Sequence, residues 1–464
     1  MIKFGTDGWR ARIADDFTFN NIRLVTAAFI LYLKKSGLAK DGVAVGFDNR
    51  FQSEDFAACA AEVCAAAGIK TYLSKISLPS PALSYFVKSH GLGAGIMITA
   101  SHNPPEWNGF KIKENFGGSS RPEVTKAVEK ILSENLFSAS GHVPQPANKF
   151  AVKIEVFDPK PEYLKHIASF VDLEKIKKAG INAVLDPMHG SGSGYLKELI
   201  DLEEINGNRD PLFGGVNPEP ILPNLEELMS YMKSMPELSV GIAIDGDADR
   251  IGAVDPTGTF ITSHYAFSLI LKHLVENRKM SGKVVKTFNI SRLVEKQAKK
   301  YGLPIDEVPI GFKHIADKMI NEKVLIGGEE SGGIGVLGNI PERDGSLCAL
   351  LLLELMAYEK KTLKQLLDGI MDELGHYYYD RIDLHVERET ALPKMKELNK
   401  MGSFAGSKIT NIETLDGIKL NFEDSSWILF RLSGTEPLLR IYAEGASFDR
   451  VEQLLEVGQK AILS

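Results

Sequence analysis

The sequence predicts an α/β protein with three tandem doubly wound α/β domains, each with a mixed sheet, and a smaller C-terminal α+β domain, arranged around a central cleft. The chain has 464 residues, 44% hydrophobic and 25% charged, which is an ordinary globular composition with room for three or four domains. Segments with helical periodicity alternate with short apolar segments typical of strands up to about residue 374. Beyond that residue the pattern becomes β-rich.

The first domain is expected over residues 1–147. Thr18 offers a side-chain oxygen suited to cap a helix, and Gly37 is suited to end it. The stretch 138–148 contains Ser, Gly and Pro in the proportions of a linker and sets the boundary. Between Gly37 and this linker we expect a strand at 43–47, a helix at 53–67, a strand at 69–73, a helix at 81–89 and a strand at 94–99.

The same alternation restarts twice, which predicts a second domain over 148–255, a third over 256–370 and the C-terminal domain over 371–464. In the second we expect strands at 182–185 and 240–244 and helices at 195–201 and 224–234. In the third we expect strands at 283–287 and 324–326 and helices at 263–276, 291–301 and 313–321. Helices at 347–360 and 363–374 lead into the C-terminal domain, with strands at 377–386, 409–415, 427–432 and 438–444 and a helix at 448–463.

The charge of the chain limits its partners. Lys and Arg number 54 against 61 Asp and Glu, so the formal net charge is −7. Such a chain has no overall attraction to nucleic acid or to an anionic membrane, and a phosphate-bearing partner needs a local basic pocket. The longest strongly apolar run, 347–353, is far shorter than the roughly 20 residues that span a bilayer. We therefore expect small-molecule partners, no nucleic acid and no membrane, and make no prediction of the oligomeric state.

The start of the chain and its cysteines predict a cytoplasmic protein. Asp7, Asp15 and Asp16 stand where a signal peptide needs apolar residues. The three cysteines are an odd number in a large chain, and they fit small buried apolar side chains in a reducing compartment.

A serine loop follows the strand expected at 94–99. Two consecutive prolines just beyond it prevent a helix from starting, so Ser101 is held on an extended or turned loop. With His102 beside it and Lys111 downstream, this hydroxyl could act as a nucleophile or phosphate carrier. The alternative is an ordinary turn in which Ser and Asn bond to their own backbone.

Three carboxylates at alternate positions, Asp245, Asp247 and Asp249, follow the apolar strand expected at 240–244. Such dense like charge beside a buried strand repels unless a hard cation neutralises it, and ligands that are all oxygen favour Mg²⁺, Mn²⁺ or Ca²⁺. The EF-hand pattern does not fit, because Arg250 stands where that loop requires glycine. A solvated Asp-rich turn is the alternative.

A glycine-rich loop at 327–333 again follows a strand. Glu329 and Ser331 are two positions apart, so they can face the same way and accept hydrogen bonds from neighbouring hydroxyls of a polyol. A turn without function is the alternative.

The segment 431–437 has the groups that a phosphate dianion needs. Arg431 and Arg440 flank a Ser-Gly-Thr turn and offer forked guanidinium donors, hydroxyls and backbone N–H groups. A polar hairpin is the alternative. Arg10, in an N-terminal loop, is either a phosphate contact or one half of a surface ion pair.

The four loops of Ser101, Asp245, Glu329 and Arg431 each belong to a different predicted domain. Ligands of α/β sheets gather outside the carboxyl ends of strands, so these loops could converge on one cleft. Five segments then resemble the α-D-phosphohexomutase superfamily, in sequence and in order, between positions 4 and 440. They are FGTDGWR, TASHNPPEWNGFK, DGDADR, GEESGG and RLSGTEP.

The resemblance implies a phosphoserine enzyme. Ser101 would donate a phosphoryl group to a hexose phosphate, and the resulting 1,6-bisphosphate would turn around and return its other phosphate. Mg²⁺ would sit between that phosphate and the carboxylates of Asp245, Asp247 and Asp249, with Lys111 as the general acid/base.

The resemblance also implies how the sugar is held, with the fourth domain closing over the intermediate. For Lys313 the alternative is an exposed lysine at a helix start. The implied residues are Arg10 and His102 at the transferred phosphate, Arg250, Lys313, Glu329 and Ser331 at the sugar, and Arg431, Ser433, Gly434, Thr435 and Arg440 at the far phosphate.

Glu330 and the segment 311–313 look more like the phosphoglucomutase type than the glucosamine type. The resemblance therefore favours glucose 1-phosphate and glucose 6-phosphate, with mannose phosphates as a second pair and glucose 1,6-bisphosphate as activator or intermediate. A phosphoglucosamine mutase is the alternative within the family.

Two other classes of protein stay open. One is a metal-dependent sugar phosphatase in which Asp245 is the nucleophile and Asp247 its acid, which leaves Ser101 and the arginines unexplained. The other is a sugar-phosphate sensor, which binds its ligand without transferring a phosphate.

Overall fold

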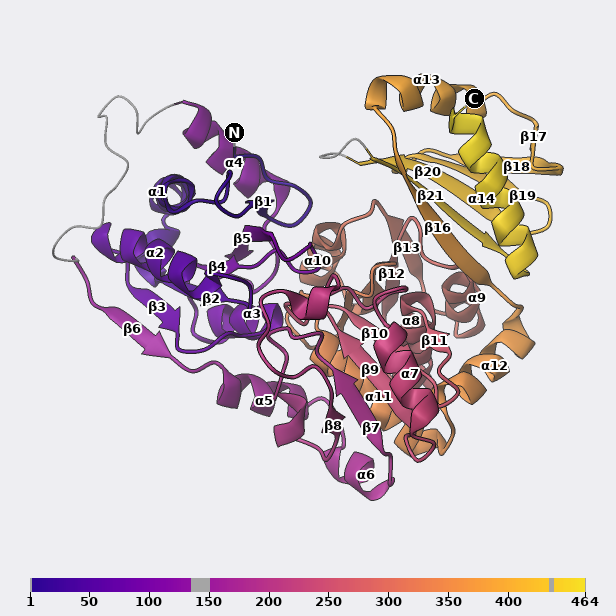
Figure 1. Ribbon diagram of the computed structural model, residues 1–464, viewed down its shortest axis with the longest axis horizontal. Helices are drawn as coiled ribbons and strands as arrows, with labels where there is room; N and C mark the ends of the chain where they lie inside the picture. Colours follow the sequence, from indigo (N-terminus) through magenta and orange to yellow (C-terminus); the bar gives the residue numbers. More distant parts are fainter. Residues whose placement is uncertain (1, 135–150, 434–437, 464) are drawn as a thin grey trace.

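The computed structural model describes residues 2–134, 151–433 and 438–463, and it arranges them in four sheets. The first three sheets mix parallel and antiparallel pairs, and the fourth is antiparallel throughout. Figure 1 shows the first sheet in indigo and purple at the left and the last in orange and yellow at the upper right. The predicted fold class is confirmed.

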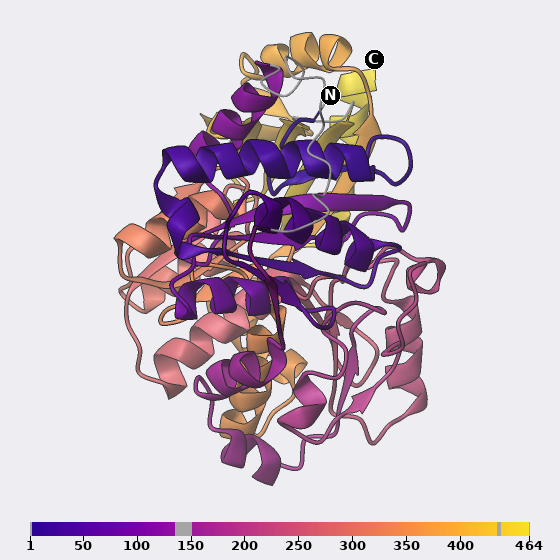
Figure 2. The same ribbon diagram turned by 90° about the vertical axis from the view of Figure 1, so that its left-hand side faces the viewer.

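The first sheet is parallel at its centre and antiparallel at one edge. Its elements are β1 (Trp9–Arg12), α1 (Phe19–Lys35), the 3₁₀ turn η1 (Leu38–Asp41), β2 (Val43–Phe47), α2 (Ser53–Ala66), β3 (Thr71–Ser74), α3 (Ser80–Ser89), β4 (Ala94–Ile98), β5 (Trp107–Glu114), α4 (Pro122–Ser133) and β6 (Ile154–Phe157). The strand order is β1-β5-β4-β2-β3-β6. Helices α1, α2 and α4 share one apolar core, whereas α3 packs into another on the opposite face. Figure 2 shows the long indigo helix α1 across the outer side of this domain.

The first sheet reaches beyond the boundary expected after residue 147. Strand β6 lies C-terminal to that boundary and pairs in parallel with β3, because the open edge of β3 offers unpaired backbone groups. The first sheet therefore extends to residue 157, and the linker expected at 138–148 falls outside the described residues.

The second sheet has the order β11-β10-β9-β7-β8. Its elements are α5 (Lys160–Ala168), α6 (Leu173–Lys178), β7 (Ala183–Asp186), η2 (Leu196–Glu198), β8 (Glu203–Glu204), η3 (Phe213–Gly215), α7 (Glu226–Ser234), β9 (Val240–Ile244), β10 (Ile251–Val254) and β11 (Phe260–Ile261). The helix expected at 195–201 is wrong, since only the 3₁₀ turn η2 forms there. Gly194 has a left-handed φ of 71° just before it, and the amides that follow bond mostly to carbonyls three residues back.

The third sheet has the order β13-β12-β14-β15. Its elements are α8 (Ser263–Lys272), the π-helical turn η4 (His273–Asn277), β12 (Lys283–Thr287), α9 (Arg292–Lys300), β13 (Ile305–Val308), α10 (Phe312–Asn321), β14 (Val324–Gly328), β15 (Ile334–Val336), α11 (Gly345–Glu359) and α12 (Leu363–Leu374). Helix α11 is apolar on all sides and almost wholly buried, which suits the centre of a large core.

The fourth sheet has the order β16-β21-β20-β19-β18-β17. Its elements are β16 (Tyr378–His385), α13 (Arg388–Leu398), β17 (Ser403–Phe404), β18 (Ser407–Glu413), β19 (Ile418–Phe422), β20 (Trp427–Leu432), β21 (Leu438–Gly445) and α14 (Phe448–Leu463). Helix α14 packs on β16 and β21, as Figure 1 shows.

One apolar core links the first three domains, whereas the fourth has its own. The shared core joins α3 of the first domain to the sheets and helices of the second and third, including α11. The fourth domain meets the third through a small cluster of Phe288, Trp427, Leu429 and Tyr442. Among the described residues, none of the helices combines the length and apolar character needed to cross a bilayer.

Candidate active site

Ser101 lies on the loop after β4, as the sequence predicts. Its side chain is almost fully buried, and its Oγ donates to Asp245 Oδ2 at 2.7 Å. The backbone has a left-handed φ of 54°, which is unusual for a residue with a Cβ. His102 lies beside it, with Nδ1 at 3.4 Å from Ser101 Oγ.

Asp245, Asp247 and Asp249 lie on the loop between β9 and β10, and all three are fully buried. Each offers a carboxylate oxygen within 4.8 Å of the other two. Burial, together with the charges of Asp249 and Asp247, raises the pKa of Asp245 well above its ordinary value. Asp247 Oδ1 and Asp249 Oδ1 are buried without a hydrogen-bond partner among the described residues. The three buried carboxylates, two of which keep an oxygen without a donor, fit a divalent metal ion.

Lys111 points from β5 into the same cluster. Its Nζ lies 2.8 Å from Asp247 Oδ2, 2.9 Å from Asp7 Oδ2 and 3.5 Å from Asp249 Oδ2. Burial lowers the pKa of this ammonium, but the three carboxylates outweigh it and the net pKa is raised. Lys111 therefore holds its proton in this arrangement and offsets part of the negative charge of the three carboxylates.

Arg343, on the loop before α11, completes the charge balance. Its Nη2 lies 2.6 Å from Asp7 Oδ2 and 2.7 Å from Asp249 Oδ2, and its Nη1 lies 3.3 Å from Glu329 Oε2. These carboxylates come from three different domains, so Arg343 ties the domains together at the site.

Arg10 and Arg250 flank the serine loop. Arg10 Nη1 donates to the side chain of Asn103, two residues after Ser101. Arg250 lies 3.1 Å from Glu219 and 3.9 Å from Asp245. Withdrawal from water, and then the charges of Arg250 and Arg10, lower the pKa of His102 well below its ordinary value, so its imidazole is neutral at pH 7.

The glycine-rich loop after β14 brings one of its two glutamates to this cluster. Glu329 is buried against Arg343, and the Ile251 N–H donates to the Gly332 carbonyl across the domain boundary. Glu330 turns the other way and accepts from Tyr379 Oη and Arg381 Nη1 of the fourth domain, at 2.9 Å and 3.0 Å. Ser331, the next residue of the loop, is half-buried.

The arginines of the fourth domain form a separate group. Arg431 and Arg440 are cross-strand partners on β20 and β21. Arg431 Nε lies 3.0 Å from Asp416 Oδ2, which also accepts the Ile310 N–H of the third domain at 2.9 Å, and Arg440 Nε lies 3.5 Å from Asp383 Oδ2. Within the described parts of the chain, no hydrogen bond or ion pair joins these arginines to the loop of Asp245.

Four further residues were predicted at the site: Ser433, Gly434, Thr435 and Lys313. The Ser433 N–H donates to the Leu438 carbonyl at 2.7 Å. Gly434 and Thr435 lie outside the described residues. Lys313 is the second residue of α10 and is half-buried. Burial lowers its pKa, and the charges of Asp7 and Arg431 both act on it, which places it between the two groups of site residues.

Four family models match the chain in order, and they describe domains I, II, III and IV of the phosphoglucomutases and phosphomannomutases. They cover residues 1–139, 161–258, 262–374 and 384–457. The chain belongs to the phosphoglucomutase/phosphomannomutase family. This family lies within the α-D-phosphohexomutase superfamily, and its members are isomerases, so the predicted resemblance and enzyme class are confirmed.

Similar proteins span the whole length of this phosphohexomutase. A phosphoglucomutase/phosphomannomutase of Thermococcus kodakarensis is 32% identical over 99% of this chain and 98% of its own length. A phosphoglucosamine/phosphogalactosamine mutase of Sulfurisphaera tokodaii is 30% identical over 99% and 98%. A solved structure from Thermus thermophilus, described as a candidate phosphomannomutase, has a TM-score of 0.87 at 34% identity and covers 100% of this chain and 99% of its own.

Sequence reasoning missed several residues of this phosphohexomutase cluster. Asp7 lies within the segment FGTDGWR, where nothing local indicates its role, and Arg343 and Glu342 precede α11 with no periodicity to mark them. Glu342 pairs with the buried Lys113 at 2.5 Å. For Glu342 and Arg343, the position of charged residues between a buried strand and a buried helix was a signal that could have indicated them.

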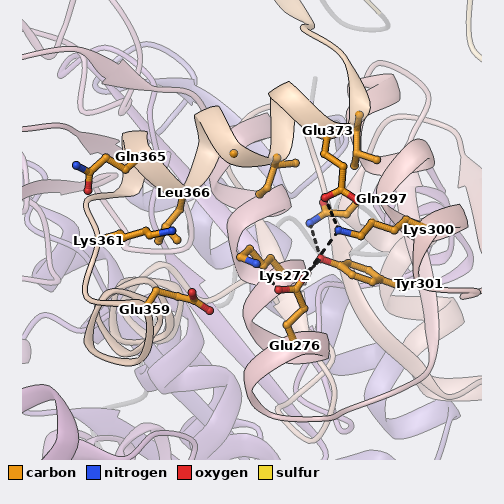
Figure 3. A pocket seen from close by; sticks show the side chains of 13 residues that line it. Lys272, Glu276, Gln297, Lys300, Tyr301, Glu359, Lys361, Gln365, Leu366 and Glu373 are labelled. Carbon is orange, nitrogen blue, oxygen red and sulfur yellow. Dashed lines mark hydrogen bonds and ion pairs between the residues drawn. The ribbon is translucent and has the colours of Figure 1, made fainter.

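A cavity of about 160 Å³ lies elsewhere in the third domain, between α8, η4, α9 and α12 (Figure 3). None of the candidate site residues lines it. Its charges largely neutralise one another, since Lys300 pairs with Glu373 at 2.5 Å and Tyr301 Oη donates to Glu276 at 2.6 Å. It adds nothing to the site.

Proposed function

We propose that this protein interconverts hexose 1-phosphates and hexose 6-phosphates through a phosphorylated Ser101, with glucose phosphates as the favoured substrates and mannose phosphates as a second pair. The observation that supports it most is Ser101 Oγ, buried in a left-handed turn 2.7 Å from Asp245 of a different domain. An ordinary turn needs no such juxtaposition.

In this proposal the phosphoryl group leaves Ser101 Oγ and joins the free hydroxyl of a hexose phosphate. The product is a hexose 1,6-bisphosphate, which reorients and returns its other phosphoryl group to Ser101. Transfer of this kind needs alignment and neutralisation of charge more than covalent help from the protein. Lys111 exchanges the proton at the reacting oxygen, and Arg10 and His102 orient the phosphate.

Asp245, Asp247 and Asp249 are proposed to hold Mg²⁺, which would neutralise charge on the transferred phosphoryl group. Glu329 and Ser331, with Arg250 and Lys313, hold the sugar. Arg431, Ser433, Gly434, Thr435 and Arg440 hold the phosphate that is not being transferred. The buried free thiols fit a reducing compartment, so we propose the cytoplasm as the place of action.

Glucosamine phosphates are the second substrate class to test. A relative that is 30% identical is named for glucosamine and galactosamine phosphates, and another of 30% identity is named a probable phosphoglucosamine mutase. The carboxylate of Glu330 accepts from Tyr379 and Arg381, so the preference for glucose rests on the resemblance and not on a sugar contact of this residue.

The test is a coupled assay of the whole protein on glucose 1-phosphate with Mg²⁺ and a trace of glucose 1,6-bisphosphate, run beside the mannose and glucosamine pairs. Isomerisation together with a phosphate-sized mass on the peptide that contains Ser101 is the expected result. Release of inorganic phosphate without isomerisation would make it a phosphatase, and binding without either reaction would make it a sensor.

A further inference from the structure

Asp48, Asn49 and Arg50 form a turn directly after β2, and the proposed reaction uses neither of its charged residues. Both charged side chains are fully buried, with Arg50 Nε at 3.2 Å from Asp48 Oδ2. The guanidinium also lies 4.8 Å from the ring centre of Phe213. Removing two charges from water costs free energy unless they are paired and fully hydrogen-bonded, so the other contacts of this pair show what it organises.

Arg50 directs its hydrogen bonds to the serine loop. Its Nη2 donates to the carbonyls of Ser101 and Asn103, both at 2.7 Å. Its Nη1 donates to the carbonyls of Pro104 at 2.8 Å and Trp107 at 3.0 Å. The planar guanidinium of Arg50 therefore donates to four backbone carbonyls of this segment. A lysine ammonium at the same place cannot reproduce this geometry.

Asp48 holds the other side of the same serine. Its Oδ2 accepts from Thr99 Oγ1 at 2.5 Å, and that hydroxyl accepts the Ser101 N–H at 2.9 Å. The backbone N–H of Ser101 is thus fixed through Thr99 and its carbonyl through Arg50. These two restraints hold the left-handed φ of 54°, a conformation that persists in a residue with a Cβ only where the surroundings impose it.

Asn49 connects the same turn to the second domain. Its Nδ2 donates to the carbonyls of His189 at 2.8 Å and Gly190 at 2.9 Å. Gly190 packs directly on the loop of the three aspartates, since a Cβ at Gly190 would lie 2.8 Å from the carbonyl oxygen of Gly246. The turn therefore contacts the serine loop directly, and it reaches the loop of the three aspartates through Gly190.

We propose that the turn Asp48-Asn49-Arg50 is a positioning element that holds Ser101 in the backbone conformation from which Oγ, or a phosphoryl group on it, faces the loop of Asp245. The proposal rests on the proposed function. None of the three side chains is assigned to the substrate, so the turn acts on the rate of transfer and not on the affinity for hexose phosphate. A displacement of about 1 Å at a reacting group costs on the order of a hundredfold in rate.

The test compares Arg50→Lys, which keeps the charge and loses the fork, with Thr99→Val, which removes only the hydroxyl that links Asp48 to Ser101. Arg121→Lys, an arginine paired with Glu114 away from the serine loop, is the matched control. Stopped-flow or quenched reactions measure the rate at which glucose 1,6-bisphosphate phosphorylates Ser101. Calorimetry measures the Kd of glucose 1-phosphate, and thermal unfolding shows that each variant is folded.

For Arg50→Lys we expect kcat and the rate of Ser101 phosphorylation to fall about a hundredfold, and for Thr99→Val about tenfold, with KM and Kd changed by no more than about twofold. The control keeps all four values. If Arg50→Lys does not fold, Thr99→Val decides. Wild-type phosphorylation rates in the folded variants, or a weakened Kd that accounts for the loss, would overturn the positioning role. Absence of phosphorylation in the wild-type protein would instead overturn the proposed function.

Discussion

The two ends of the candidate site differ in how far their charges are withdrawn from water. Around Ser101 the side chains of Asp245, Asp247, Asp249 and Lys111 are at most 1% exposed. In the fourth domain Arg431 is 15% exposed, and its partner Asp416 24%. The first end lies where three domains share one core, whereas the second lies on a domain with its own core.

The difference separates two tasks. Buried, multiply paired charges keep one geometry, which suits a group that must react. Partly exposed charges can exchange partners at a small cost in free energy, because water solvates them, and this suits a group that must bind and release phosphate. We therefore expect changes at the first end to act on kcat and changes at the second to act on KM.

The strongest test of the buried end is Ser101→Ala. Without a hydroxyl there is no phosphate carrier, so we expect turnover to fall by at least about a thousandfold while the protein stays folded. The coupled assay and intact mass measure the loss, with Ser89→Ala on the surface of α3 as the matched control. Full activity of Ser101→Ala would move the phosphate carrier elsewhere.

Asp247→Asn tests the metal assignment at the same end. It removes one anionic ligand and one partner of Lys111, and we expect kcat to fall on the order of a hundredfold or more. The rise in Tm that millimolar Mg²⁺ gives the wild-type protein should shrink or vanish, because a ligand stabilises only a fold that binds it. Asp55→Asn, on the exposed face of α2, should keep both. An unchanged Mg²⁺ effect on Tm would place the metal elsewhere.

Arg431→Ala tests the exposed end. Loss of a charge-assisted contact with phosphate should raise the KM for glucose 1-phosphate about 10- to 100-fold with a smaller change in kcat. Arg431→Lys, which keeps the charge, should give an intermediate KM. A fall in kcat at constant KM would contradict the division between the two ends.

The smallest effect is expected for a buried carboxyl that has no cation beside it. Burial raises the pKa of Asp186, at the end of β7, to about 6, although the Met188 N–H lowers it. The folded state therefore keeps a proton that the unfolded chain releases near pH 4, and the stability from this group is lost as pH rises from about 4 to about 6. Asp186→Asn should escape that loss, so its Tm relative to wild type should rise by about 2–4 °C between pH 4.5 and pH 7. A constant difference in Tm would show that Asp186 is ionised throughout.

Strands and helices with apolar periodicity were predictable. The bounds expected for β2, β9, β12, α12, β20 and α14 agree with the structure, because each is a run or face whose burial the sequence alone specifies. Strand β5 was not predicted. It carries Lys111 and Lys113, which are charged and still buried, because carboxylates from other domains neutralise them.

The loops of the site were predictable, whereas the residues from other domains that contact them were not. Ser101 and Asp245 each follow an apolar strand, and that position is visible in the sequence. Arg343 and Asp7 lie 336 positions apart, and Arg50 holds carbonyls more than 50 positions away. Contacts of this kind depend on how domains pack, and local spacing carries no trace of them.

Arg431 and Arg440 already have anionic companions, Asp416 and Asp383, within their own domain. A phosphate that binds there must displace these carboxylates from the arginines. Its net affinity therefore reflects how much more strongly the arginines bind phosphate than carboxylate, and not the whole attraction between arginine and phosphate. Dissociation of the phosphate is also favoured, because the arginines can then pair with the carboxylates again. In the proposed reaction the bisphosphate has to dissociate from one site, turn and bind again without leaving the enzyme. Two such competing carboxylates would keep the affinity for phosphate low enough for this reorientation.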